Sequence, residues 1–89
     1  MAYNAIGGVF MYYVLFNSIT MATRVRNHFK YEGVTLSMTH TPKEISKGGC
    51  SYSLIVKPVY LNNVLAIADD YGITVKGVYQ QTESGFIKV

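Results

Sequence analysis

Cysteine is almost absent from this chain, since Cys50 is the only one among 89 residues. A single cysteine excludes an internal disulfide and a structural zinc site built from several cysteines. It also agrees with a reducing compartment, so we predict a cytoplasmic location.

Long apolar runs and concentrated charge are missing as well. The longest apolar run, Val9 to Phe16, has eight residues. That is too few to cross a bilayer, and no basic segment precedes the run as it would in a signal peptide. The net charge of +3 comes from eight basic and five acidic residues, which form no basic stripe of the kind seen in nucleic-acid binders. We therefore expect no membrane association, and the composition disfavours a nucleic-acid partner.

Apolar residues, by contrast, make up 49% of the chain, which is enough for a core and excludes a disordered protein. A chain of this length forms one domain and buries only about 60–65% of its unfolded surface, so its stability is marginal unless it is idealised or oligomeric. We expect an N-terminal extension over residues 1–10, with Met11 as a candidate original start. The domain is expected over residues 11–81, and residues 82–89 are expected to be a C-terminal tail or a short extension of the last strand.

Hydrophobic periodicity predicts six elements in the order strand, helix, strand, strand, helix, strand. The strands are expected at residues 9–16, 34–39, 52–57 and 74–81, and the helices at residues 19–31 and 60–71. The first strand is apolar at both its odd and its even positions, as in a central strand with both faces covered. Asn17 and Ser18 supply an N-cap for the first helix, and Gly33 and Gly72 are expected to end the two helices in a left-handed conformation.

This order predicts an α+β fold of the split βαβ or ferredoxin-like type. Right-handed crossovers place four strands in one antiparallel sheet, with both helices on one face. The first and third strands are then central. The two helix ends, Tyr31-Glu32-Gly33-Val34 and Asp70-Tyr71-Gly72-Ile73, are alike, which indicates two half-repeats.

The segment from Thr39 to Tyr52, between two predicted strands, contains the single cysteine and the densest run of titratable groups. A thiol reacts as its thiolate, and nearby cations or converging backbone amides raise the thiolate fraction. We therefore interpret Cys50 as a candidate reactive thiol that is able to hold an anionic persulfide. The residues interpreted as its chemical environment are Lys43, Lys47, His40 and Glu44, and those interpreted as shaping the loop are Pro42, Ser46, Gly48 and Gly49.

Each of these residues also has an ordinary structural interpretation. A lone cysteine in a small domain is commonly a buried apolar side chain. Glu44 either acts as a general base, pairs with Lys47 or caps a local turn, and Ser46 commonly bonds the backbone in such a turn. His28 and His40 lack the spacing of a metal site, so no metal and no cofactor are predicted.

Several runs in the chain resemble a known family. They are Asn17-Ser18-Ile19-Thr20-Met21-Ala22, Gly33-Val34, Thr41-Pro42-Lys43-Glu44-Ile45-Ser46 before Cys50, and Gly72-Ile73 with Gly77-Val78-Tyr79. From about Met11 to Gln80 the chain resembles the Putative Se/S carrier protein-like family. The resemblance implies a compact α+β domain in which Cys50 carries sulfur or selenium, received as a persulfide or selenide equivalent from a donor protein and passed to an acceptor. In that family arginine is common at the place of Lys43, and glycine is common at the place of Ser51.

Two other functions agree with parts of the sequence. The apolar and aromatic surplus in residues 9–16 favours a ligand-sensing or assembly module that forms a homodimer through the sheet face without helices. An RRM-like RNA-binding sheet is a third interpretation, because Tyr13 to Asn17 loosely matches one RRM signature. The second signature fails at Gly49 and Cys50, where an aromatic and a small residue are expected. The leading interpretation is a carrier without turnover of its own.

Overall fold

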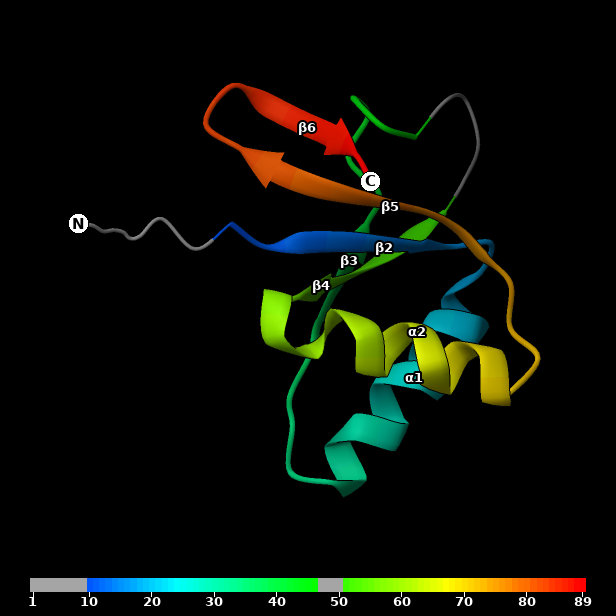
Figure 1. Cartoon of the computed structure of the whole chain (residues 1–89). Coiled ribbons are helices and arrows are strands. Elements are labelled where there is room, and N and C mark those ends of the chain that lie inside the picture. Colours follow the sequence, from blue (N-terminus) through cyan, green and yellow to red (C-terminus); the bar gives the residue numbers. More distant parts are fainter. Residues whose placement is uncertain (1–9, 47–50) are drawn as a thin grey trace.

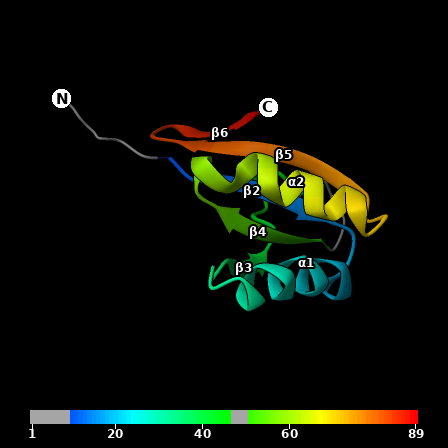
Figure 2. The ribbon, with the colours of Figure 1, turned by 60° about the horizontal axis from the view of Figure 1, so that its bottom comes forward.

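Two helices pack on one face of a five-stranded antiparallel sheet (Figures 1 and 2). The computed structural model describes residues 10–46 and 51–89, so the expected N-terminal extension lies outside the described residues apart from Phe10. Along the described chain the elements are β2 (Tyr12–Phe16), α1 (Ile19–Tyr31), β3 (Ser37–His40), β4 (Tyr52–Val56), the 3-10 turn η1 (Pro58–Tyr60), α2 (Leu61–Asp70), β5 (Val75–Thr82) and β6 (Gly85–Lys88).

The strand order across the sheet is β3-β4-β2-β5-β6, and every neighbouring pair is antiparallel. β2 lies between β4 and β5, as its two-sided apolar sequence predicts. The α+β class is therefore confirmed. The prediction of a four-stranded ferredoxin-like sheet is wrong as stated, because β6 adds a fifth strand beside β5.

β6 is formed by residues that were expected to be a tail or a short strand extension. It pairs with β5 from Tyr79↔Lys88 to Thr82↔Gly85. The Thr82 hydroxyl donates a hydrogen bond of 3.0 Å to the Gly85 carbonyl across the hairpin turn, and Gly85 has φ +139°, a region that favours glycine. Four residues are too few for a clear periodic pattern, so pairing with β5 decides this strand.

The helices begin and end through local interactions that the sequence predicts. The Ser18 hydroxyl accepts a hydrogen bond of 3.2 Å from the Met21 backbone amide and so caps α1. Gly33 and Gly72 follow the two helices with φ of +84° and +68°. After each glycine, the next amide donates at 2.8 Å to a carbonyl five residues earlier, the pattern of a Schellman motif. The two helix ends are therefore alike in structure as well as in sequence.

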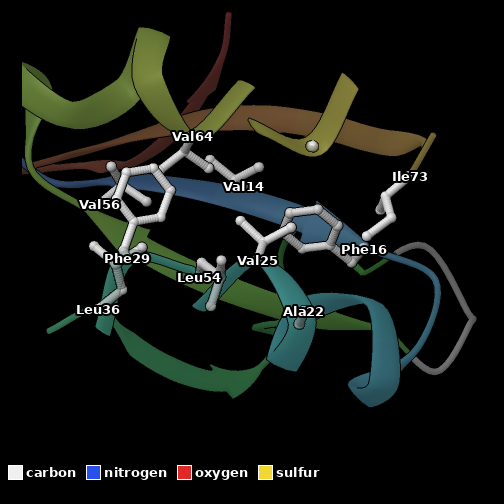
Figure 3. Close-up of a cluster of buried hydrophobic side chains, with 11 residues drawn as sticks. Val14, Phe16, Ala22, Val25, Phe29, Leu36, Leu54, Val56, Val64 and Ile73 are labelled. Carbon is white, nitrogen blue, oxygen red and sulfur yellow. The ribbon is translucent and has the colours of Figure 1, made fainter. Parts of the chain in front are cut away.

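The core lies between the helices and the sheet (Figure 3). Side chains of α1 and α2, such as Val25 and Val64, meet Val14 and Phe16 of β2 there. The buried members of this core cluster are Val14, Phe16, Ala22, Val25, Phe29, Leu36, Leu54, Val56, Val64, Ala68 and Ile73. Because side chains alternate along a strand, Tyr13 and Leu15 lie on the opposite side of the sheet. We call that side the helix-free face.

Candidate functional site

The loop that the sequence analysis singled out is described at both of its ends. Four of its predicted residues, Lys47, Gly48, Gly49 and Cys50, lie outside the described residues. The site is therefore built from the segment 41–46, which follows β3, and from Ser51, which directly follows Cys50 in the sequence and precedes β4.

Three buried hydroxyl groups join the two ends of this loop. The Ser51 hydroxyl donates to Thr41 Oγ1 at 2.7 Å, and Thr41 Oγ1 lies 2.8 Å from Ser53 Oγ. The Thr41 backbone amide also donates to the Ser51 carbonyl at 3.1 Å. The exposed fractions of Thr41, Ser51 and Ser53 are only 8%, 3% and 0%. We call these three side chains the hydroxyl chain.

The hydroxyl chain lies on the helix-free face. Ser53 is opposite Leu15 of β2 in the antiparallel register, and Leu15 lies on the helix-free face because side chains alternate along the strand. In Figure 1 the segment 41–46 lies on the side of the sheet away from α1 and α2. Ile45 of this segment and Leu15 are both buried, although neither belongs to the core cluster under the helices. The helix-free face is therefore covered at this end of the sheet.

A turn follows Thr41 and carries two of the predicted site residues. The Ile45 backbone amide donates a hydrogen bond of 3.0 Å to the Pro42 carbonyl. Lys43 and Glu44, between these residues, are exposed, and Pro42 is half-buried. The loop-shaping roles of Pro42, at the start of this turn, and of Ser46, half-buried just after it, stay predictions.

His40 faces the other side of the sheet. It is paired in register with Tyr52, which packs against the core cluster on the helix side. The two rings lie 4.5 Å apart between centroids at an angle of 37°, and His40 Nε2 is 3.5 Å from the Tyr52 hydroxyl. Strand alternation thus places His40 and the hydroxyl chain on opposite faces of β3 and β4.

Sequence reasoning gave no role to the three hydroxyl residues. Serine and threonine are ordinary on strands and turns, and their types do not predict burial. The one sequence signal is that Ser51 and Ser53 are two residues apart at the start of β4, next to a predicted loop, so their side chains point to the same face. They are buried only because the segment 41–46 lies over that face.

A second feature lies at the surface between α1 and the end of α2. A hollow of about 490 Å³ is lined there by Arg24, Asn27, His28, Tyr31, Glu32 and Tyr71. It is wide open, and each of its six lining residues carries a polar or charged group. Within residues 10–46 and 51–89, no group of three or more His, Cys, Asp or Glu residues is arranged to hold a metal ion. Neither helix in that part of the chain has the length and apolar character needed to span a membrane.

The described structure is that of a small α+β domain in which a polar loop is fastened at both ends to the helix-free side of its sheet. A comparison with protein-family models matches residues 11–80 to the family described as Putative Se/S carrier protein-like. The chain belongs to this family, which confirms the resemblance. Comparisons with curated proteins and with solved structures found no match.

Proposed function

We propose that this protein is a sulfur or selenium carrier and that Cys50 is the thiol that carries the atom. Family membership over residues 11–80 is the observation that carries the proposal. Cys50 lies inside the matched range and is the only cysteine of the chain. A carrier that holds its cargo on a protein thiol therefore has one residue available for the task.

The transfer step proposed for Cys50 needs no external oxidant. The Cys50 thiolate attacks the terminal sulfur of a cysteine persulfide on a donor protein. The new bond joins Cys50 Sγ to that sulfur, the sulfur–sulfur bond of the donor breaks, and the donor cysteine leaves as a thiolate. The products are a Cys50 persulfide and a reduced donor. The same exchange at the terminal selenium of a donor Cys–S–SeH group transfers selenium, and an acceptor protein takes the atom by the reverse step.

The described ends of the loop support this chemistry in two ways. Lys43 is exposed on the turn that follows Thr41, and a cation near a thiol favours its thiolate. Ser51, which follows Cys50 in the sequence, is held by the hydrogen bond of its hydroxyl to Thr41. In this proposal Lys43 and Lys47 favour the anion and Glu44 is a further polar group of the loop. His40 is the last residue of β3 and faces the other side of the sheet.

Alkylation kinetics test the proposal. The iodoacetamide rate of the native protein at about pH 7 is compared with that of the same protein unfolded in urea, and Cys50→Ser serves as the blank. We expect the native rate to be higher, because a raised thiolate fraction speeds alkylation. Intact mass of protein purified without reductant is expected to show adducts of about 32 Da or about 80 Da on Cys50. A native rate no higher than the unfolded rate, together with an absence of adducts, contradicts the proposal.

A second candidate function is an assembly module, and one observation favours it. Tyr13, Ile55 and Tyr79 are opposite one another in register on the helix-free face, and Phe86 of β6 makes an edge-on ring contact with Tyr13 at 5.0 Å. All four side chains are only half-buried. Three of the four are aromatic, and partly exposed aromatic side chains of this kind are enriched at protein interfaces. A monomer in light scattering at high concentration contradicts this function and leaves the carrier proposal intact.

A further inference from the structure

β3 is an edge strand, and its outer edge is unpaired in the described part of the chain. The strand order places β4 on one side of β3 and no described strand on the other. The Thr41 amide donates to the Ser51 carbonyl, toward β4, and alternate residues of an antiparallel strand bond toward the same side. Thr39 therefore bonds toward β4 as well, while the backbone N–H and C=O groups of Met38 and His40 point to the outer edge.

This edge lacks the residues that proteins commonly use to block an edge strand, which are lysine, proline and the extra residue of a β-bulge. β3 has the sequence Ser-Met-Thr-His, and its register with β4 runs without a shift. At the opposite edge of the sheet, by contrast, β6 carries Lys88. An extended segment can therefore add to the sheet beside β3. Only two residues of β3 point there, so such a segment needs side-chain contacts as well.

A row of α1 side chains runs beside this edge. Thr23, Arg26 and Lys30 lie on one side of α1, because residues three and four apart share a helix face. The Thr23 hydroxyl donates to the Met38 sulfur at 3.8 Å, which places the row next to β3. In Figure 2, α1 and β3 lie together on one side of the domain, with β5 and β6 on the other. A hollow of about 260 Å³, which we call the β3 groove, is lined by Arg26, Lys30, Thr35 and Leu36.

The two cations of this groove have no carboxylate partner in the described part of the chain. The ion pair found among those residues joins His28 and Glu32, on the side of α1 that faces the end of α2. Lys30 is exposed and Arg26 is half-buried. α1 itself, Ile19–Tyr31, contains no acidic residue. The groove is therefore electrostatically suited to a partner that brings carboxylates.

We propose that the outer edge of β3 and the β3 groove form a docking site for an extended acidic segment of a partner protein. The segment adds to the sheet as an antiparallel strand, with backbone hydrogen bonds to Met38 and His40. Residues directly opposite each other in an antiparallel pair have their side chains on the same face, and Met38 packs on the helix side. Acidic side chains at the paired positions therefore lie on the helix side, toward Arg26 and Lys30.

A partner protein fits this edge better than a second copy of the chain does. A second copy that pairs its own β3 here brings another α1, which has the same cations and no acidic residue. Repulsion between like charges opposes that contact. The docking site is also independent of the carrier function, because it uses neither Cys50 nor the turn that carries Lys43.

A synthetic peptide tests the site. The probe is fluorescein-labelled Thr-Val-Glu-Val-Glu-Val-Thr, whose two glutamates share one face of an extended chain. A charge control has lysine in place of both glutamates. Two backbone controls are N-methylated, one at both glutamates and the other at the first two valines. Fluorescence anisotropy with the full chain measures binding, and amide hydrogen exchange followed by NMR locates it.

We expect the acidic peptide to bind and to slow amide exchange at Met38 and His40, because their N–H groups become hydrogen-bonded. Thr39, already bonded toward β4, is expected to change little. Methylation at the glutamates is expected to abolish binding, since their N–H groups face β3. Methylation at the valines, whose N–H groups face away, is expected to preserve it. The lysine peptide is expected not to bind.

Paired substitutions test the two cations. Arg26→Gln combined with Lys30→Gln is expected to weaken binding of the acidic peptide by about fivefold or more, and added salt is expected to weaken wild-type binding toward that of the variant. Lys76→Gln combined with Lys88→Gln is the matched control. It removes the same charge from exposed lysines of β5 and β6, on the other side of the sheet, and is expected to keep wild-type binding.

Docking at β3 is contradicted if the acidic peptide does not bind, if it slows exchange only outside β3, or if both paired variants lose binding equally. A rise in mass by light scattering with protein concentration, together with slowed exchange at Met38 and His40, would assign the edge to a second copy instead. Tighter binding of a single-stranded oligonucleotide, lost in the Arg26 and Lys30 variant, would make the groove a phosphate site. None of these measurements involves Cys50, so each result leaves the carrier proposal as it stands.

Discussion

His28 of α1 and Tyr71, just after α2, are joined by a contact of 2.8 Å between imidazole Nδ1 and the phenol hydroxyl, across 43 positions of sequence. The other imidazole nitrogen, Nε2, lies 3.4 Å from a Glu32 carboxylate oxygen. The Arg24 guanidinium lies 5.4 Å from the centre of the Tyr71 ring. These contacts join the two helices at the solvent edge of their layer, where the core cluster does not reach.

This contact gives a first prediction. Tyr71→Phe keeps the ring over which Arg24 lies and removes the hydroxyl, so we expect a loss of about 0.5–1 kcal/mol in the free energy of unfolding. Tyr31→Phe is the control, because Tyr31 lines the same hollow but is 91% exposed; it is expected to cause no measurable loss. Urea unfolding monitored by circular dichroism gives both values. Equal losses in the two variants would show that the His28 contact adds nothing.

Gly33 gives a prediction about backbone conformation. Its φ is +84°, and a Cβ built there meets nothing within 4 Å. Gly33→Ala is therefore expected to lose about 1–2 kcal/mol through the left-handed backbone alone. Gly33→Asn is expected to lose less, since asparagine tolerates this conformation. Thermal and urea unfolding measure both variants, and an alanine variant as stable as the wild type would contradict the assigned helix end.

The hairpin strand β6 gives a third prediction, which tests the fifth strand directly. Phe86 contacts the Tyr13 ring on β2 across β5, while its neighbour Ile87 points the other way and is 57% exposed. We expect Phe86→Ala to cost about 1–2 kcal/mol and Ile87→Ala to cost less than about 0.5 kcal/mol. The comparison uses urea unfolding at low protein concentration. A cost for Ile87→Ala that equals or exceeds that of Phe86→Ala would contradict the placement of β6.

Lys43 gives a prediction about the loop chemistry. If its ammonium group favours the Cys50 thiolate, Lys43→Gln lowers the alkylation rate at about pH 7 by about twofold, and added salt lowers the wild-type rate toward that of the variant. Lys57→Gln is the matched control, because Lys57 is also exposed and lies at the opposite end of β4 from Ser51. Equal rates in both lysine variants would remove Lys43 from the site.

The helices and the central strand follow from local sequence. The 3.6-residue spacing of Ala22, Val25 and Phe29, the Ser18 cap and Gly33 predict α1 with its observed bounds, Ile19–Tyr31. These signals are strong because each acts within one or two helical turns, where the chain has few alternatives. The sequence also predicted that the candidate loop connects two strands. The positions of Lys47 and Cys50 lie outside the described residues and stay predictions.

Local sequence patterns do not predict contacts between residues far apart in the chain. The fifth strand depends on pairing between β5 and β6, and the contact between His28 and Tyr71 joins residues far apart in the chain. The burial of Thr41, Ser51 and Ser53 depends on a segment that folds back over the helix-free face.

By itself, then, the sequence determined the helices, their ends, the central strand and the family, because short-range periodicity and motif order are local properties of the chain. Only the tertiary structure decided which polar side chains are buried and which strand closes the sheet. Serine and threonine are equally suited to water and to a hydrogen-bonded interior, and a four-residue strand is stable only beside its partner. In both cases the neighbours in space, rather than the neighbours in sequence, set the outcome.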